Sequence, residues 1–206
     1  MHYGFAIDIK RCIGCHTCAV GCRMENNLPI GKWWNRILTD GGEEMDSARG
    51  RFPNLTLSYI PLMCQHCENP ACVKVCPVGA TYRDADTGVV RQDYDKCIGC
   101  RMCMAACPYT GIRSFNWDEP QYYTDVTFGG ADVPVHQKHV VEKCTMCWHR
   151  LAKGEEPYCV DVCPVLARTW GDLDDPNSEV SKLIATRQYK TLLPDLGTRP
   201  SVYYLV

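Results

Sequence analysis

Long hydrophobic runs, runs of one charge sign and a recognisable export signal are all missing from this sequence. Its apolar stretches fall short of the roughly 18 to 20 residues that a membrane-spanning helix needs, so membrane association is expected only through another subunit. Met1 to Ala6 contain no basic segment followed by an apolar one, and the chain has no Arg-Arg pair. The interspersed charges, with a formal net charge of −2, indicate no nucleic-acid or lipid-headgroup surface.

Large aromatic core residues are also scarce, with only four Phe among 206 residues. Cysteine, in contrast, is abundant, with sixteen copies. So many cysteines indicate either the disulfide framework of a secreted protein or metal ligation in a reducing compartment. Because no signal peptide is apparent, we favour ligation, which can supply folding free energy that a thin core does not.

The cysteines form an internal repeat of four groups, with none left over, and each group begins C-x2-C and ends C-x3-C. Groups one to four are, in order, Cys12, Cys15, Cys18, Cys22; Cys64, Cys67, Cys72, Cys76; Cys97, Cys100, Cys103, Cys107; and Cys144, Cys147, Cys159, Cys163. Groups one and three have the tight form C-x2-C-x2-C-x3-C. The middle gap opens to four residues in group two and to eleven in group four.

These spacings favour cubane [4Fe-4S] clusters. Three thiolates on one tight loop can bind three corners of a cubane, and the fourth corner is then ligated from elsewhere, as in two-cluster ferredoxins. Proline directly follows the fourth cysteine in groups two, three and four, at Pro77, Pro108 and Pro164, and diverts the chain there. Group one departs from this pattern, with Arg23 in the same place.

Other metal sites fit less well. A zinc ribbon uses two C-x2-C units, whereas groups one and three place three cysteines at i, i+3 and i+6. A Rieske centre needs C-x-H together with C-x2-H, and only the first occurs, at Cys147 to His149. We therefore interpret five histidines as surface residues or residues behind the ligands: His16, His66, His136, His139 and His149.

Small and basic residues lie beside the first cysteines. Gly14 and Gly99 fall inside the first C-x2-C of their groups, where a side chain would keep backbone N-H groups away from the inorganic sulfides. Lys10-Arg11, Lys96 and Lys143 directly precede the first cysteine of groups one, three and four. Such cations either raise a reduction potential or are simply solvated, and the sequence leaves both open.

Local patterns predict an α+β fold. Strands are expected before each group, over 3–9, 55–60, 89–92 and 140–141, and 84–88 is typical of a hairpin turn. Helical stretches are expected over 70–76, 157–163 and 178–188, the last capped by Asn177 or Ser178. The connections 23–63 and 109–143 are expected to be loop-rich, either covering clusters, touching a partner or simply lying on the surface. After Leu193 we expect an extended tail on another subunit or on this chain.

On these motifs the chain resembles the four-cluster iron-sulfur subunit of molybdenum or tungsten oxidoreductases, typified by the electron-transfer subunit of dimethyl sulfoxide reductase. The resemblance covers essentially the whole chain and rests on the four groups in order and on Tyr3-Gly4-Phe5, Cys107-Pro108-Tyr109 and the closing Thr198 to Leu205. It implies two ferredoxin-like bicluster modules with loop-rich insertions. Residues 1–53 plus 139–175 would hold groups one and four, residues 54–138 groups two and three, and residues 176–206 a helix and partner-binding tail.

The resemblance also implies four [4Fe-4S] clusters whose ligands are shared between groups. We call the implied ligand sets a to d: Cys12, Cys15, Cys18 and Cys163 (set a); Cys144, Cys147, Cys159 and Cys22 (set b); Cys64, Cys67, Cys72 and Cys107 (set c); Cys97, Cys100, Cys103 and Cys76 (set d). Some relatives, such as nitrate reductases, have Trp at the second position of group three and a three-iron cluster. Cys100 is present here, so four cubanes are expected.

The function implied by the resemblance is non-catalytic relay of single electrons. The partners would be a large molybdenum or tungsten bis-pterin catalytic subunit, facing groups one and four, and a quinol-linked membrane subunit or other redox partner. The alternative is a polyferredoxin-type subunit of a hydrogenase or formate-linked complex. A stand-alone enzyme with an open iron is disfavoured because no group lacks a cysteine. The chain is expected to be soluble and membrane-associated through partners, either cytoplasmic or exported with a catalytic partner bearing a twin-arginine signal.

Overall fold

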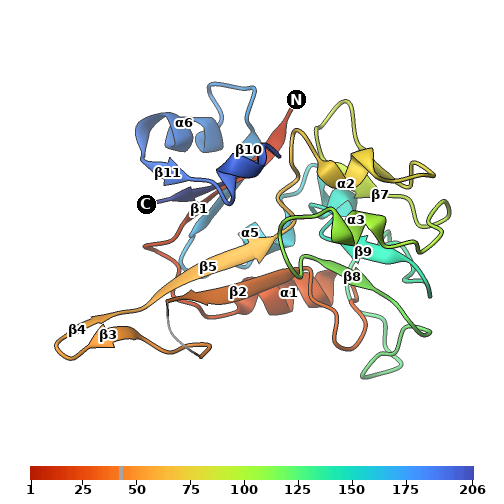
Figure 1. Cartoon of the computed structure of the whole chain (residues 1–206), viewed down its shortest axis with the longest axis horizontal. Coiled ribbons are helices and arrows are strands. Elements are labelled where there is room, and N and C mark those ends of the chain that lie inside the picture. Colours follow the sequence, from red (N-terminus) through yellow and green to blue (C-terminus); the bar gives the residue numbers. More distant parts are fainter. Residues whose placement is uncertain (42–43) are drawn as a thin grey trace.

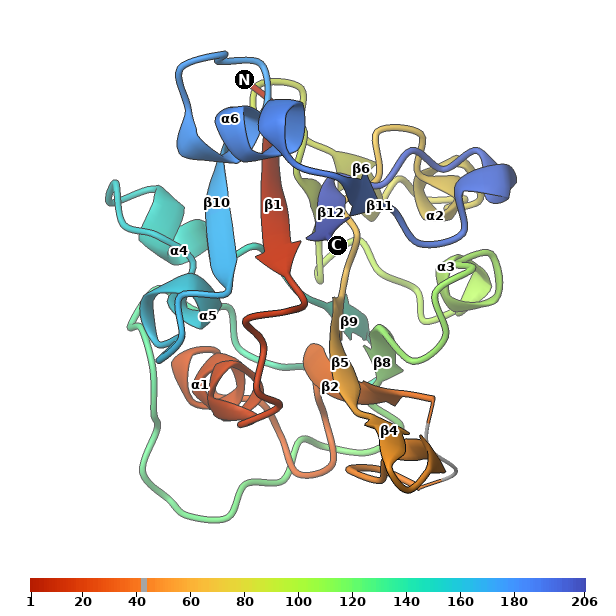
Figure 2. The ribbon, with the colours of Figure 1, turned by 90° about the vertical axis from the view of Figure 1, so that its left-hand side faces the viewer.

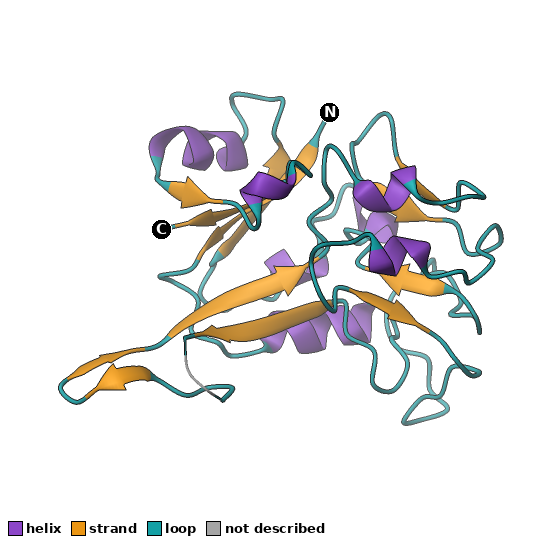
Figure 3. Ribbon diagram, viewed as in Figure 1, coloured by secondary structure: helices purple, strands orange, loops and turns teal. Residues whose placement is uncertain are grey.

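The computed structural model describes residues 1–41 and 44–206 of the chain, so residues 42–43 of the first expected insertion lie outside the described residues. Short helices and strands are joined by long loops (Figures 1 and 3). The helices are α1 (Thr17–Glu25), α2 (Ala71–Lys74), α3 (Met102–Ala105), α4 (Trp148–Leu151), α5 (Tyr158–Asp161), α6 (Glu179–Thr186) and the 3-10 turn η1 (Pro194–Leu196). The strands are β1 (Tyr3–Asp8), β2 (Asn35–Asp40), β3 (Arg49–Arg51), β4 (Asn54–Thr56), β5 (Ser58–Met63), β6 (Thr81–Arg83), β7 (Val90–Gln92), β8 (Arg113–Phe115), β9 (Val141–Lys143), β10 (Arg168–Asp172), β11 (Tyr189–Lys190) and β12 (Val202–Leu205). The mixed α and β content agrees with the sequence expectation.

A four-stranded sheet, in the order β10-β1-β12-β11, joins the two ends of the chain. Strand β1 pairs antiparallel with β10, with Phe5 opposite Trp170, and parallel with β12, with Phe5 opposite Val202. Figure 2 shows these three strands side by side with α6 at one end. Phe5 and Ile7 are fully buried because β1 lies between two other strands and packs into the main core.

The C-terminal segment docks on its own chain. Helix α6 is capped by Ser178, one of the two expected caps, whose hydroxyl accepts a hydrogen bond from the Ser181 amide at 3.2 Å. Val180 of this helix packs against Ala6 and Leu205. Strand β12 is almost completely buried in the sheet, so of the two alternatives for the tail, the structure favours docking on this chain for its final strand. The stretch before it includes two exposed leucines, Leu193 and Leu196.

Two strand pairs cross the predicted module boundaries. Strand β5 pairs with β2 across the boundary at residue 53, and β8 pairs with β9 across the boundary at residue 138. Between them, β6 and β7 form the hairpin expected around residues 84–88. Groups two and three therefore lie in a segment inserted between β2 and β9. At its two ends, strands β5 and β8 of this segment form backbone hydrogen bonds with β2 and β9. The division into two modules stays a prediction.

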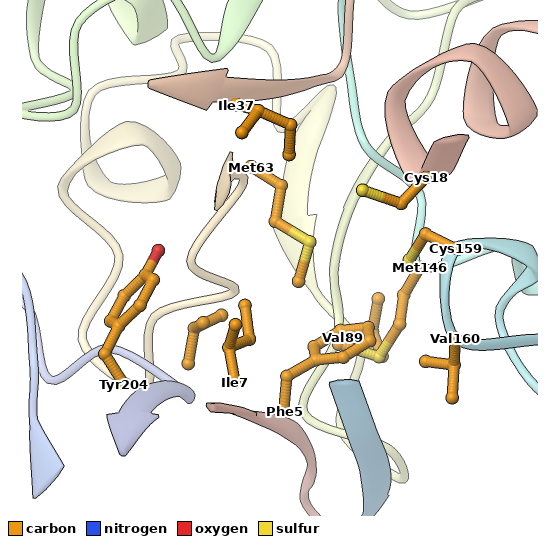
Figure 4. Close-up of a cluster of buried hydrophobic side chains, with 11 residues drawn as sticks. Phe5, Ile7, Cys18, Ile37, Met63, Val89, Met146, Cys159, Val160 and Tyr204 are labelled. Carbon is orange, nitrogen blue, oxygen red and sulfur yellow. The ribbon is translucent and has the colours of Figure 1, made fainter. Parts of the chain in front are cut away.

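Sulfur atoms are part of the main core. Figure 4 shows Cys18 and Cys159 beside Met63 and Met146, above the apolar side chains of the sheet. Nine of the sixteen cysteines are buried, and none of the sixteen forms a disulfide. Cysteine therefore occupies much of the interior that phenylalanine would fill in another protein of this size.

Candidate iron-sulfur sites

Each cysteine group adopts the same local structure. The third cysteine is the second residue of a short helix in every group: Cys18 in α1, Cys72 in α2, Cys103 in α3 and Cys159 in α5. In groups two, three and four this helix ends shortly before the fourth cysteine, which proline follows. In group one, which has Arg23 instead, α1 runs on to Glu25 and carries both Cys18 and Cys22. The absence of proline in group one thus has a structural consequence.

The first C-x2-C of every group turns through a left-handed residue directly before the second cysteine. The φ angles are +68° at Gly14, +42° at His66, +68° at Gly99 and +59° at Met146. Glycine adopts this conformation without cost, whereas an L side chain costs about 1 to 2 kcal/mol. The same turn persists at His66 and Met146 despite that cost, which indicates that the loop shape, rather than glycine itself, is what the four groups share.

The four cysteines of set a line one small cavity. Cys12, Cys15, Cys18 and Cys163 surround it together with Arg168. Cys163 comes from the other end of the sequence, and its sulfur accepts a hydrogen bond from the Ala167 amide at 3.3 Å. Three thiols from one loop and one from a distant group therefore meet in one place.

The thiols of set b interact inside the protein. Burial raises the pKa of Cys22 well above its usual value, and the nearby thiols of Cys144 and Cys147 raise it further. Burial also raises the pKa of Cys144 to about 12. Such thiols are protonated at neutral pH when unligated, so binding of a cluster must release their protons.

Set c is also brought together. Burial raises the pKa of Cys67 to about 12 and that of Cys107 to about 11, and both interact with Cys64. Cys22 and Cys144 of set b pack in the same apolar cluster as Cys64. Sets b and c are therefore neighbours in the interior.

Set d is brought together only in part. Cys103 interacts with Cys97 of its own group, and it packs beside Cys72 of set c, because α2 packs on α3. The sulfur of Cys76 accepts a hydrogen bond from the Thr81 amide at 3.4 Å. Among the described contacts, none joins Cys76 or Cys100 to the other two, so their membership in set d stays a prediction from the family resemblance.

The thiols are not arranged for a single metal ion. Within residues 1–41 and 44–206, no three His, Cys, Asp or Glu side chains converge closely enough to hold one ion. A zinc ion bound by four cysteines needs all four sulfurs about 2.3 Å from one centre, whereas the thiolates of a cubane each bind a different iron.

Three buried cations lie near the cysteines. Lys143 is almost fully buried, and its ammonium donates hydrogen bonds to the backbone oxygens of Val90 and Cys144. By contrast, Lys96 is 63% exposed and pairs with Asp93 at 2.9 Å. Solvation therefore applies to Lys96 but not to Lys143, for which the effect on a reduction potential stays a prediction.

The other two buried cations, Arg113 and Arg168, were not singled out from the sequence. Burial disfavours the charge on Arg168, but the thiols of Cys18 and Cys159 outweigh burial and raise its pKa. For the pKa of Arg113 the same balance holds, with Cys72 as the main favourable neighbour. Each begins the strand that follows a Cys-Pro pair, β8 for Arg113 and β10 for Arg168. This shared place in the repeat is the signal that could have identified them.

Arg113 provides a test of whether a cluster fits this interior. All three of its guanidinium nitrogens are buried, and none has a hydrogen-bond partner among the described residues. A buried guanidinium without partners costs several kcal/mol, roughly, so it calls for an acceptor of negative charge. The sulfides and thiolates of a cluster are such acceptors, and the residues present therefore fit the group.

Three histidines lie in the interior and not on the surface. His66, inside the first C-x2-C of group two, is fully buried, and its Nδ1 accepts a hydrogen bond from the Val90 amide at 3.2 Å. His149 contacts Glu25 at 2.8 Å. His136 lies between Glu142 Oε1, at 2.7 Å from Nδ1, and the Asn26 backbone oxygen, at 2.9 Å from Nε2. Both ring nitrogens of His136 thus face acceptors, which favours the doubly protonated ring.

We expect His136→Gln to destabilise the protein most at low pH. Burial lowers the pKa of His136, but the hydrogen bond with Glu142 outweighs burial and raises the pKa above 6.5. A raised folded-state pKa adds stability that is fully present below 6.5 and is lost as the pH rises through the folded-state value. The difference in free energy of unfolding between wild type and variant should be roughly 1.5 to 3 kcal/mol at low pH and shrink as pH rises. Anaerobic urea titrations across this range measure it, and a pH-independent difference would contradict the assignment.

No helix in the described part of the chain combines the length and the apolar character needed to cross a bilayer. The longest is α1, with nine residues.

Comparison with known proteins places these sites in a family. Models described as 4Fe-4S dicluster domains match residues 11–80, 55–122 and 89–164, which cover successive overlapping pairs of groups. Because the pairs overlap, these matches support [4Fe-4S] clusters without deciding which groups share one.

Three relatives that match over nearly the whole chain are named as subunits of reductases. A Halobacterium salinarum protein, named as the iron-sulfur subunit of a dimethyl sulfoxide reductase, is 52% identical over 99% of this chain and 79% of its own length. The arsenate respiratory reductase iron-sulfur subunit of Shewanella sp. (strain ANA-3) is 39% identical over 100% of this chain and 96% of its own length. A selenate reductase subunit of Mesobacillus selenatarsenatis is 43% identical over 97% of this chain and 70% of its own length. These matches confirm the resemblance drawn from the cysteine groups, and this chain belongs to the family of non-catalytic iron-sulfur electron-transfer subunits of such reductases.

Proposed function

We propose that the chain carries four [4Fe-4S] clusters, on sets a to d, and relays single electrons between a molybdenum or tungsten bis-pterin catalytic subunit and a quinol-linked membrane subunit or other redox partner. A bound [4Fe-4S] cluster takes up and releases one electron. The protein contributes the spacing, burial and hydrogen bonds that make transfer between neighbouring clusters possible.

The observation that carries this proposal is the continuous order of the four sets. Cys18 of set a packs with Cys159 of set b, and Cys144 of set b packs with Cys64 of set c. Cys72 of set c packs with Cys103 of set d. The sets therefore support a linear path a-b-c-d.

Exposure supports the same order. The two exposed cysteines are Cys15, in set a, and Cys100, in set d. All four thiols of set b are buried, and those of set c are buried or half-buried. Electrons would thus enter and leave at the two ends of the path, while the middle is shielded from water and oxygen.

Purification of the tagged chain from its host under anaerobic conditions tests the setting of this path. A co-purifying large subunit that contains molybdenum or tungsten is the expected result. A co-purifying hydrogenase subunit without either metal would favour the alternative, a polyferredoxin-type subunit of a hydrogenase or formate-linked complex.

Cys100→Ser tests the proposed polarity, in which set d faces the quinol-linked partner. We expect the variant complex to lose most quinol-linked turnover while turnover with a soluble donor to the catalytic subunit stays within about twofold of wild type. Cys15→Ser, at the other exposed end, is the matched variant and should impair transfer to the catalytic subunit. Equal loss in both assays for Cys100→Ser would contradict the polarity.

A further inference from the structure

Each proposed pair of clusters has one buried arginine at an equivalent place in the repeat. Arg168 follows Cys163 by five residues and begins β10, and Arg113 follows Cys107 by six residues and begins β8. Their exposed fractions are only 4% and 6%. Arginine is almost never this buried unless its charge is compensated.

The guanidinium group of Arg168 contacts two sulfur atoms. Its Nη1 lies 3.8 Å from Cys159 Sγ and 3.4 Å from Met63 Sδ. Its Nη2 donates to Asn35 Oδ1 at 3.1 Å. Among residues 1–41 and 44–206, no carboxylate forms an ion pair with Arg168 or Arg113. The cysteines beside Arg168 and Arg113, once they are thiolates that ligate a cluster, are thus the groups whose negative charge can compensate the two guanidinium charges.

The two arginines have matching surroundings. Arg168 interacts with Cys18 and Cys159, the third cysteines of groups one and four. Arg113 interacts with Cys72 and Cys103, the third cysteines of groups two and three. Those third cysteines also pack together, where α1 contacts α5 in one case and α2 contacts α3 in the other. Each guanidinium therefore lies where its two cluster sites meet, set a with set b and set c with set d.

We propose that Arg168 and Arg113 set the reduction potentials of the two pairs of clusters, each by holding one positive charge between two neighbouring clusters. This inference rests on the proposed function, because it requires the four clusters. Reduction adds one negative charge to a cluster, and a nearby positive charge in a region of low dielectric constant stabilises that form. Arginine keeps its charge under all conditions, so its contribution is permanent. One charge between two sites acts on both and raises the potentials of both.

The experiment is a potentiometric titration of the cluster-loaded protein, followed by low-temperature electron paramagnetic resonance. Arg168→Gln should lower the potentials of the clusters on sets a and b, and Arg113→Gln those on sets c and d. The expected change is at least about tenfold in the equilibrium constant for reduction, which is about 59 mV for one electron. Arg168→Lys and Arg113→Lys, which keep the charge, should stay closer to wild type than the glutamine variants. Lys96→Gln is the exposed control, and its effect should be small because solvent screens its charge.

Asn35→Asp provides a second route to the same charge change. It places a carboxylate on Arg168 without removing the guanidinium, since Asn35 already contacts Nη2. In the Asn35→Asp variant, the reduction potentials of the clusters on sets a and b should fall, as they should in Arg168→Gln.

The inference is overturned if the loaded glutamine and aspartate variants keep wild-type potentials, or if lysine variants shift as far as glutamine variants. A second result would also overturn it. If neither glutamine variant binds iron, while the lysine variants bind iron but have potentials that differ from those of the wild type, the two arginines have a purely structural role. The iron content of the wild-type protein distinguishes failure of this inference from failure of the proposed function. If the wild type binds fewer than four clusters, the proposed function is wrong, and the inference about the arginines fails with it.

Discussion

Cys22→Ser is expected to remove the cluster signal that Cys147→Ser removes, and to leave the signal that Cys15→Ser removes. Cys22 belongs to group one by sequence, but its thiol lies among those of Cys144, Cys147 and Cys159. Cys18 and Cys22 are one helical turn apart in α1, so this single helix would supply ligands to two clusters. Electron paramagnetic resonance of the three reduced variants, with iron content measured on the same samples, makes the comparison.

The paired variants make this test specific. Cys15→Ser reports loss of the cluster on set a, and Cys147→Ser reports loss of the cluster on set b. If the Cys22→Ser spectrum matched that of Cys15→Ser, each group would ligate its own cluster, and sharing of ligands between groups one and four would be wrong.

Gly99→Ala should be one of the most damaging small substitutions in the chain. Gly99 has φ +68°, and an added Cβ would lie 2.5 Å from the backbone oxygen of His139. The conformation costs about 1 to 2 kcal/mol and the overlap about 1 to 3 kcal/mol, a large part of a typical stability of roughly 5 to 15 kcal/mol. A backbone oxygen cannot rotate away as a side chain can. We expect a lower denaturation midpoint and incomplete iron loading, measured anaerobically.

Gly154→Ala is the matched control for this substitution. Gly154 has a similar φ, +75°, but an added Cβ would meet nothing within 4 Å. It should therefore show only the conformational cost and keep its full iron content. Similar losses in both variants would mean that the close approach at Gly99 contributes nothing.

The cysteine repeat could be predicted from the sequence because its information is local. Spacing alone identified the four groups, and the Asp84 to Gly88 turn and the Ser178 cap were also confirmed as expected. These features depend on residues close together in the chain. Cysteine spacing, together with local turn and capping chemistry, therefore accounts for what was predicted correctly.

The features that sequence reasoning missed depend on distant contacts. The parallel pairing of β1 with β12 joins the two ends of the chain, and no local pattern in the tail specifies that partner. The burial of Arg113, Arg168 and Lys143 has the same origin, because their charges are tolerated only where groups from separate segments meet. Lys96 and Lys143 hold the same place in the sequence repeat, yet one is solvated and the other buried, so sequence position alone could not separate them.

We propose that the sixteen thiols together hold four cubane clusters. Iron and acid-labile sulfide, measured per chain on anaerobically purified protein, test it most directly. We expect about sixteen iron atoms and as many sulfides, with reducible cluster signals in low-temperature electron paramagnetic resonance. Protein that contains mainly zinc, or about eight iron atoms in an undamaged preparation, would contradict it.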